Sequence, residues 1–130
     1  MKLLIVDDDS TSRIILEKIL ASLPDCQVTS ADNGSDAWAI LDDPARSFDV
    51  VFLDLSMPGP DGFELIGRIR KAPLLKSLEI VITTGANDRS TVGKAIARGV
   101  RHYIVKPCTQ AVIIAKLQQI KPTLALPDPA

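Results

Sequence analysis

The chain has 130 residues, of which 46% are hydrophobic and 24% are charged, and its formal net charge is −1. This is the size and composition of one globular domain, and a chain without net positive charge has no overall field that would hold it on nucleic acid. No apolar run approaches the roughly 18 residues of a membrane span, and the run from Leu3 to Val6 is too short for a signal-peptide core. The cysteines, Cys26 and Cys108, fit neither a metal site nor a disulfide framework. We therefore expect a cytoplasmic protein that binds neither DNA directly nor a membrane.

The first half of the chain alternates short apolar runs with stretches of helical periodicity. The run from Lys2 to Val6 stops at three acids, and its length suits a strand buried on both faces. Apolar residues then recur on one side of a helix from Ile15 to Leu23, and Asp9 or Ser10 can cap that helix. The next predicted elements are a strand at residues 27–31, a helix at residues 35–41 and a strand at residues 49–54.

The second half continues this alternation after a break at residues 57–62, where prolines and glycines predict neither helix nor strand. The elements predicted next are a helix at 63–71, a strand at 79–84, a helix at 87–98, a strand at 102–106 and a helix at 109–120. Asn87 or Asp88 can cap the helix at 87–98, and Gly99 can close it. Five alternations of strand and helix predict an α/β fold with a parallel sheet and helices on both faces. The proline-rich residues 121–130 indicate a tail or the start of a linker.

Polar side chains stand at the carboxyl ends of four predicted strands. They are Asp7 and Asp8 after the first strand, Asp54 on the third, Thr84 on the fourth and Lys106 on the fifth. Ligands of open parallel sheets bind at this edge, so we expect these side chains to meet there. Three close carboxylates repel one another, and a hard divalent cation that prefers oxygen ligands, Mg²⁺ or Mn²⁺, would remove that penalty.

These residue types suit the transfer of a phosphoryl group to a carboxylate. A bound metal neutralises oxygens of the phosphate and of the attacking carboxylate, and Lys106 adds a fixed positive charge. The Thr84 hydroxyl can donate to a phosphoryl oxygen, while Gly85 leaves room beside it. A carboxylate that attacks phosphorus would form an acyl phosphate.

The residues at these strand ends resemble the receiver domains of two-component response regulators. The resemblance spans residues 2–120 and is carried by Val6-Asp7-Asp8, Leu53-Asp54, Met57-Pro58, Asp61-Gly62, Thr84-Gly85 and the segment from Tyr103 to Lys106-Pro107. It implies a doubly wound, flavodoxin-like fold with strand order 2-1-3-4-5, formed by residues 1–120.

The resemblance implies a role for each acid. Asp54 would accept a phosphoryl group from a sensor histidine kinase or a histidine phosphotransfer protein. Mg²⁺ would be bound by the side chains of Asp8 and Asp54, by Asp7 through water and by the backbone carbonyl of Ser56. The domain would then be a signalling switch whose only chemistry is self-catalysed phosphotransfer and autodephosphorylation.

The resemblance also implies a conformational switch. Lys106 and Thr84 would contact the phosphoryl group, and the peptide bond between Lys106 and Pro107 would be cis, which costs little before proline. Phosphorylation would draw Thr84 inward and let Tyr103 turn in behind it. This would remodel the face formed by the fourth helix, the fifth strand and the fifth helix, which could also join two copies of the chain.

Two positions that tune hydrolysis in this family lack a group to orient an attacking water. Ser56 and Ala86 lie two residues after Asp54 and Thr84, and neither offers an amide or a carboxylate. We therefore expect a comparatively long-lived phosphoryl group on Asp54.

Other interpretations of these residues are open at the level of sequence. The run Asp7 to Asp9 could only cap a helix, and Tyr103 could be an ordinary core residue. The basic residues around the fourth helix, the fifth strand and the fifth helix could be a solvated face, or a docking surface for an acidic partner or a second copy. The successive helical residues Val112, Ile113 and Ile114 cannot all face the core, so at least one should be exposed.

Two other functions compete with the signalling switch. A Mg²⁺-dependent phosphohydrolase with an aspartate nucleophile is disfavoured, because Ser56 stands where such enzymes have a second acid and no general acid is evident. A dimerisation module that works without phosphorylation is disfavoured by the complete acidic set.

Overall fold

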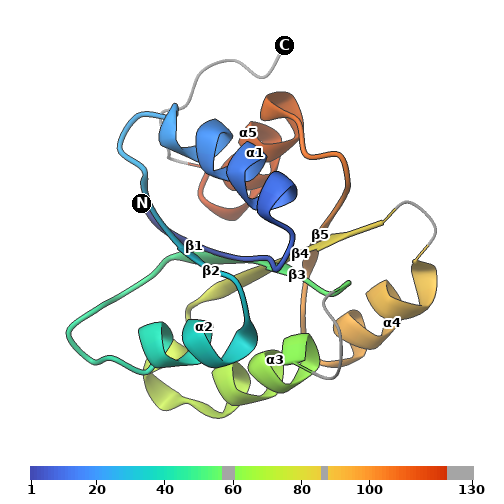
Figure 1. The fold of residues 1–130 in the computed structure, drawn as a ribbon. Coiled ribbons are helices and arrows are strands. Elements are labelled where there is room, and N and C mark those ends of the chain that lie inside the picture. The colour runs from blue at the N-terminus through green and yellow to red at the C-terminus, as the bar shows by residue number, and fades with distance from the viewer. Residues whose placement is uncertain (57–60, 86–87, 123–130) are drawn as a thin grey trace.

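The described residues, which are 1–56, 61–85 and 88–122 of a computed structural model, form one parallel sheet between two layers of helices (Figure 1). The strands are β1 (Lys2–Val6), β2 (Gln27–Ala31), β3 (Val50–Asp54), β4 (Glu79–Thr84) and β5 (His102–Val105). Their order is β2-β1-β3-β4-β5, and every pairing is parallel. The predicted doubly wound α/β fold and its strand order are confirmed.

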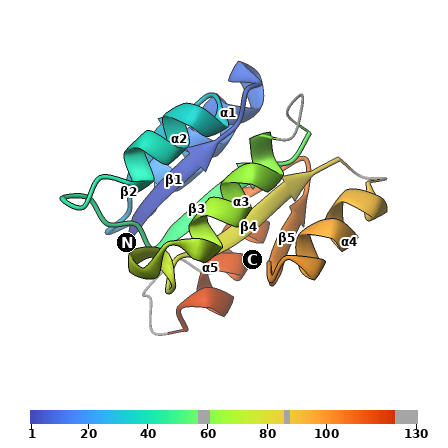
Figure 2. The ribbon, with the colours of Figure 1, turned by 90° about the horizontal axis from the view of Figure 1, so that it is seen from below.

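The helices cover both faces of the sheet. They are α1 (Ser10–Ala21), α2 (Gly34–Leu41), α3 (Asp61–Lys71), α4 (Arg89–Ala97) and α5 (Gln110–Ile120), with a 3-10 helix, η1 (Pro73–Leu75), after α3. The helices α1 and α5 lie on one face (Figure 1), and α2, α3 and α4 lie on the other, which Figure 2 shows from below. Each face therefore has its own hydrophobic core.

The central strands β1 and β3 are apolar between their end residues because both of their faces are covered. Successive residues of β1 and β3 alternate between the two cores: Leu4 and Leu53 pack toward α2 and α3, whereas Ile5 and Phe52 pack toward α1 and α5. The parallel register aligns the carboxyl ends of the strands, with Asp54 of β3 opposite Thr83 of β4. The polar residues that end the strands are therefore held by a rigid, buried scaffold.

Side-chain caps set the start of the helices. Asp9 accepts a hydrogen bond from the backbone N–H of Ser12 at 3.0 Å, as predicted for α1. Asp88 caps α4 and Thr109 caps α5, so these helices begin at residues 89 and 110, later than the sequence suggested. Asn87, the other predicted cap, lies outside the described residues. Gly99, with φ of 89°, follows α4 in the left-handed conformation that glycine favours.

One expectation about the helices was wrong. The helix α3 begins at Asp61, so Asp61 and Gly62 are helical, because glycine and proline disrupt a helix interior far more than its first turn. A Cβ atom at Gly62 would lie 2.5 Å from Leu55 Cδ2, so a larger residue there would require the Leu55 side chain to shift. On the apolar side predicted for α1, Leu16, Leu20 and Leu23 are buried, whereas Ile15 is 48% exposed.

Other sequence expectations concern single residues and the chain end. Val112 is exposed whereas Ile113 and Ile114 are buried, as predicted for the three successive positions. Within the described part of the chain, no helix has the length and apolar character to cross a bilayer. The predicted tail lies outside the described residues from position 123 onward.

Candidate functional site

Three carboxylates meet at the carboxyl edge of the sheet. One oxygen each from Asp7, Asp8 and Asp54 lies within 4.8 Å of the other two. Asp7 follows β1 and Asp54 ends the neighbouring strand β3, so strand pairing brings them together across the chain. Asp7 and Asp54 are buried, whereas Asp8 is exposed. The cluster is therefore open to solvent on the side of Asp8.

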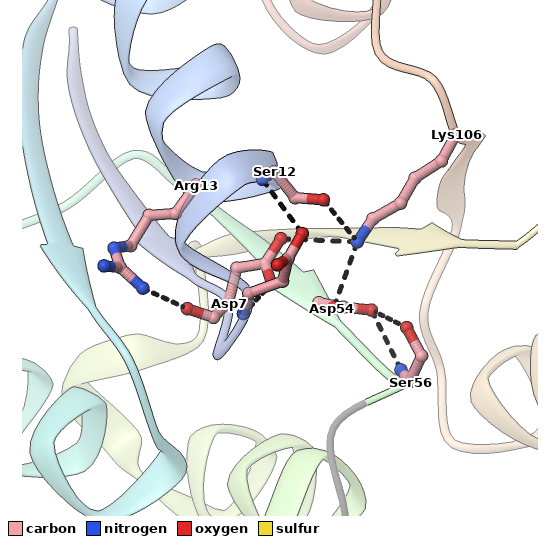
Figure 3. Close-up of polar contacts among 7 residues, drawn as sticks. Asp7, Ser12, Arg13, Asp54, Ser56 and Lys106 are labelled. Atoms are coloured by element: carbon pink, nitrogen blue, oxygen red, sulfur yellow. Dashed lines mark hydrogen bonds and ion pairs between the residues drawn. The ribbon is translucent and has the colours of Figure 1, made fainter.

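Lys106 joins this cluster from the end of β5 (Figure 3). Its ammonium donates to Asp54 Oδ2 at 3.1 Å, to Asp7 Oδ2 at 3.3 Å and to Ser12 Oγ at 3.4 Å. Burial alone would lower the pKa of Lys106, but the hydrogen bond and charge of Asp54, together with Asp7, leave that pKa raised. Lys106 therefore stays charged. The peptide bond between Lys106 and Pro107 is cis.

Ser56 holds the other oxygen of Asp54. The backbone N–H of Ser56 donates to Asp54 Oδ1 at 2.9 Å, and the Ser56 hydroxyl donates to the same oxygen. Burial would raise the pKa of Asp54, but the hydrogen bonds from Ser56 and the neighbouring Lys106 outweigh burial and lower it. Asp54 is therefore a carboxylate whose two oxygens each accept hydrogen bonds.

The pKa of Asp7 is raised in this cluster. Burial is the largest cause that raises the pKa of Asp7 from 3.8 to about 6. The charge of Asp54 raises this pKa further. The hydrogen bond from the Asp9 N–H lowers it, and the charge of Lys106 lowers it by less than the charge of Asp54 raises it. A single lysine therefore leaves the gathered negative charge incompletely balanced. The donors of the cluster are carboxylate oxygens, the type that Mg²⁺ and Mn²⁺ prefer, so the residues present fit a hard divalent cation.

Thr84 and Tyr103 lie on neighbouring strands beside the cluster. Thr84 pairs with Val105 and Ile82 with Tyr103, so both Thr84 and Tyr103 belong to the sheet face that carries α4. Thr84 Oγ1 is buried and has no hydrogen-bond partner among the described residues. Tyr103 is 48% exposed, so the interpretation of Tyr103 as an ordinary core residue was wrong.

A pocket of about 280 Å³ adjoins the cluster between α1 and the segment after β5. Asp7, Ser12 and Lys106 form its polar part, and the exposed Ile15 and Pro107 belong to its apolar wall. The cluster can therefore be approached along the side of α1.

Sequence reasoning missed three contacts of this site: the side chains of Ser12, Arg13 and Ser56. Arg13 donates from Nη1 to the backbone carbonyl of Asp7 at 3.0 Å, and Ser56 was expected to contribute only its carbonyl. Ser12 and Arg13 lie in the first turns of the helix that directly follows the acids, which is the one signal that could have indicated them. The motif residues Met57, Pro58 and Ala86 lie outside the described residues, as does the side chain of Asp61.

Comparisons with known proteins match nearly the whole chain. The family model described as response regulator receiver domain matches residues 3–118. Chemotaxis protein CheY1 of Helicobacter pylori is 37% identical over 120 residues, which are 92% of this chain and 96% of that protein. Chemotaxis protein CheY of Pseudomonas aeruginosa is 36% identical and is covered over 95% of its length by 92% of this chain.

Solved structures show the same fold. The Vibrio cholerae chemotaxis protein CheY4 has a TM-score of 0.80 at 27% identity, with 92% of this chain and 97% of that chain covered. A response regulator receiver protein from Burkholderia phymatum has a TM-score of 0.83 at 24% identity, with 97% and 98% covered.

Proposed function

Because the chain belongs to the family of response regulator receiver domains, we propose that Asp54 accepts a phosphoryl group from a sensor histidine kinase or a histidine phosphotransfer protein. One observation supports this most: Asp54 lies in a cluster of three carboxylates and 3.1 Å from the ammonium of Lys106. Receiver domains of this kind are signalling switches. We assign the switch to residues 1–120, and a partner that draws its phosphate from ATP would place it in the cytoplasm.

The oxygen donors of the cluster support a Mg²⁺ site, which Mn²⁺ could also occupy. We assign the cation to the side chains of Asp8 and Asp54 and to the backbone carbonyl of Ser56, with Asp7 acting through water. When bound, the cation neutralises oxygens of the phosphoryl group and of the attacking carboxylate. It would also offset the charge of Asp54, which adds to the effect of burial in raising the pKa of Asp7.

The proposed transfer replaces a nitrogen–phosphorus bond by an oxygen–phosphorus bond. A carboxylate oxygen of Asp54 attacks the phosphorus of a phosphohistidine, and the imidazole nitrogen leaves with the electron pair of the broken bond. Lys106 remains an ammonium ion and balances charge on the transferred oxygens. The buried hydroxyl of Thr84, which has no partner among the described residues, then donates a hydrogen bond to a phosphoryl oxygen.

A small-molecule phosphodonor tests this function without the partner kinase. Acetyl phosphate and Mg²⁺ should add one phosphoryl group to the intact mass, and hydroxylamine, which cleaves acyl phosphates, should remove it. The same incubation with EDTA should give no label. Steady release of phosphate from small phosphomonoesters, without a labelled protein, would instead support the phosphohydrolase.

Phosphorylation is expected to move Tyr103 out of solvent, because inward movement of the Thr84 hydroxyl vacates space on the sheet face that the two residues share. Tyr103 is the only tyrosine of the chain, so 3-fluorotyrosine labelling gives a single ¹⁹F resonance. That resonance should shift on phosphorylation of the wild type and stay in place in a phosphorylated Thr84→Val variant, which keeps the shape of the side chain without its hydroxyl. A fully labelled wild type with an unchanged resonance would rule out the switch.

The edge formed by α4, β5 and α5 is positively charged. From residue 88 to residue 122 the only acid is Asp88, which caps α4, and Glu79 of the neighbouring strand β4 pairs with Arg101. The basic residues of this edge are Arg89, Lys94, Arg98, Arg101, Lys116 and Lys121. Its exposed large apolar residues are Ile96, Tyr103, Val105 and Val112. A two-fold contact would place like charges against each other, so an acidic partner with apolar anchors fits this edge better than a second copy.

The phosphorylated domain is therefore expected to remain a monomer. Size-exclusion chromatography with light scattering, run before and after acetyl phosphate labelling, should give the same mass at near-physiological salt. A dimer that appears only in the labelled sample would contradict the charge argument and support the homodimer instead.

A further inference from the structure

A chain of polar contacts links the edge strand β2 to the backbone of Asp7. Ser30 Oγ on β2 donates to Glu17 Oε1 at 2.6 Å, and that oxygen lies 3.8 Å from Arg13 Nε. Arg13 Nη1 donates to the carbonyl oxygen of Asp7 at 3.0 Å, as Figure 3 shows. The guanidinium of Arg13 is therefore held on one side by α1 and β2 and bonds on the other to the loop that presents the acids.

The carbonyl that Arg13 binds belongs to the peptide group between Asp7 and Asp8. The backbone N–H of Asp7 donates to the Ala31 carbonyl at 3.1 Å, and the N–H of Asp9 donates to Asp7 Oδ1 at 2.9 Å. With the Arg13 bond, both backbone polar groups of Asp7 have partners. A rotation of the Asp7–Asp8 peptide, which would change the directions in which the two side chains leave the backbone, must break the bond to Arg13.

We propose that Arg13 is a positioning residue for the Mg²⁺ site, with Glu17 and Ser30 holding it in place. The inference rests on the proposed function, because the ligand it concerns is the cation of that function. Arg13 bonds to a backbone oxygen and not to a carboxylate of the cluster, so it acts through the orientation of Asp7 and Asp8. Glu17 offsets its charge and limits the repulsion that a free guanidinium would exert on a cation.

Positioning and simple electrostatics predict opposite signs for the loss of Arg13. Removal of a positive charge near an acidic cluster should tighten the binding of a divalent cation, by Coulomb's law. Removal of a group that orients the ligands should weaken it, and partners behind metal ligands typically contribute about 10–100-fold in affinity. The direction of the change therefore separates the two roles.

The test is a calorimetric Mg²⁺ titration of the full chain. Arg13→Met should raise the Kd for Mg²⁺ about 3–10-fold. This effect is smaller than that of losing a group bonded directly to a metal-binding carboxylate, because Arg13 bonds to the backbone. The matched control is Lys18→Met, which removes an exposed positive charge from the same helix and should leave the Kd unchanged or slightly lower. Arg13→Lys keeps the charge but lacks the planar guanidinium with its several N–H donors, and it should also weaken Mg²⁺ binding. Glu17→Gln should weaken Mg²⁺ binding less.

A second measurement needs no cation. In EDTA, amide hydrogen exchange at Asp9, whose N–H bonds to Asp7 Oδ1, should become faster in Arg13→Met and stay unchanged in Lys18→Met. If Arg13→Met does not fold, Arg13→Lys and Glu17→Gln provide both measurements.

The outcomes separate this inference from the function on which it rests. A wild type that binds no Mg²⁺ overturns the proposed metal site and the inference together. A wild type that binds Mg²⁺, with Arg13 variants that bind it equally or more tightly and exchange at the wild-type rate, overturns only the positioning role.

Discussion

Asp54→Asn is expected to reduce phosphoryl labelling by acetyl phosphate to background, below about 1% of the wild-type level, because the amide oxygen is not a nucleophile of carboxylate strength. The substitution keeps the size of the side chain and an oxygen that can accept the two hydrogen bonds from Ser56. It also removes one negative charge from a crowded cluster, so the fold should be retained. Intact mass spectrometry after incubation with Mg²⁺ measures the effect.

A matched variant shows whether the loss is specific to Asp54. Glu64→Gln removes an exposed acid of α3 away from the cluster and should label at the wild-type rate. Circular dichroism of both variants should match the wild type. Label that persists in Asp54→Asn and maps by tandem mass spectrometry to another residue would show that the phosphoacceptor lies elsewhere.

Asp7→Asn is expected to stabilise the metal-free domain at neutral pH. Burial, reinforced by the charge of Asp54, raises the pKa of Asp7 from 3.8 to about 6. The folded state therefore binds a proton more tightly than the unfolded state does. The stability from this group is complete below about pH 4 and is lost as the pH rises through about 6. A shift of about two units corresponds to about 3 kcal/mol, so the variant should gain about 1–3 kcal/mol at pH 7.5.

Urea unfolding in EDTA at several pH values measures this effect. The gain from Asp7→Asn should shrink toward zero below about pH 3, where the wild-type carboxyl is protonated in both states. Added Mg²⁺ should stabilise the wild type by mass action and the variant much less, because the variant lacks one of the proposed metal-binding acids. A variant less stable than the wild type at pH 7.5 would mean that the ion pair between Asp7 and Lys106 outweighs the burial and repulsion of the carboxylate.

The sequence predicted the sheet well because each strand is a short apolar run that ends at polar residues. Three strands, at residues 2–6, 27–31 and 79–84, have the predicted bounds. The convergence of Asp54 and Lys106 across the sheet could be anticipated because parallel strands share one carboxyl edge. Helix starts were less well predicted: the cap residues Asp88 and Thr109 lie outside the helices, where periodicity alone does not separate them from the first turn.

The contacts around the acids could not be predicted in the same way. They depend on how α1 is rotated about its own axis, which the apolar pattern determines only to within one side of the helix. The pattern grouped Ile15 with Leu16 and Leu20, whereas the structure buries the two leucines and leaves Ile15 exposed. The observed rotation directs Arg13 to the Asp7 carbonyl. The burial of the Thr84 hydroxyl without a described partner likewise depends on packing and cannot be predicted from any single residue.

The uneven distribution of charge makes the domain a dipole. Most of its acids lie in the part of the chain up to Asp54, which includes β1, β2, α1 and α2. Residues 88–122, around β5 at the opposite edge, contain seven lysines and arginines and a single acid. The electric field of this dipole therefore orients an approaching charged protein before contact. The rate of encounter falls as added salt screens the field. A phosphodonor drawn to one pole and an effector drawn to the other would meet the same molecule without competing for one surface.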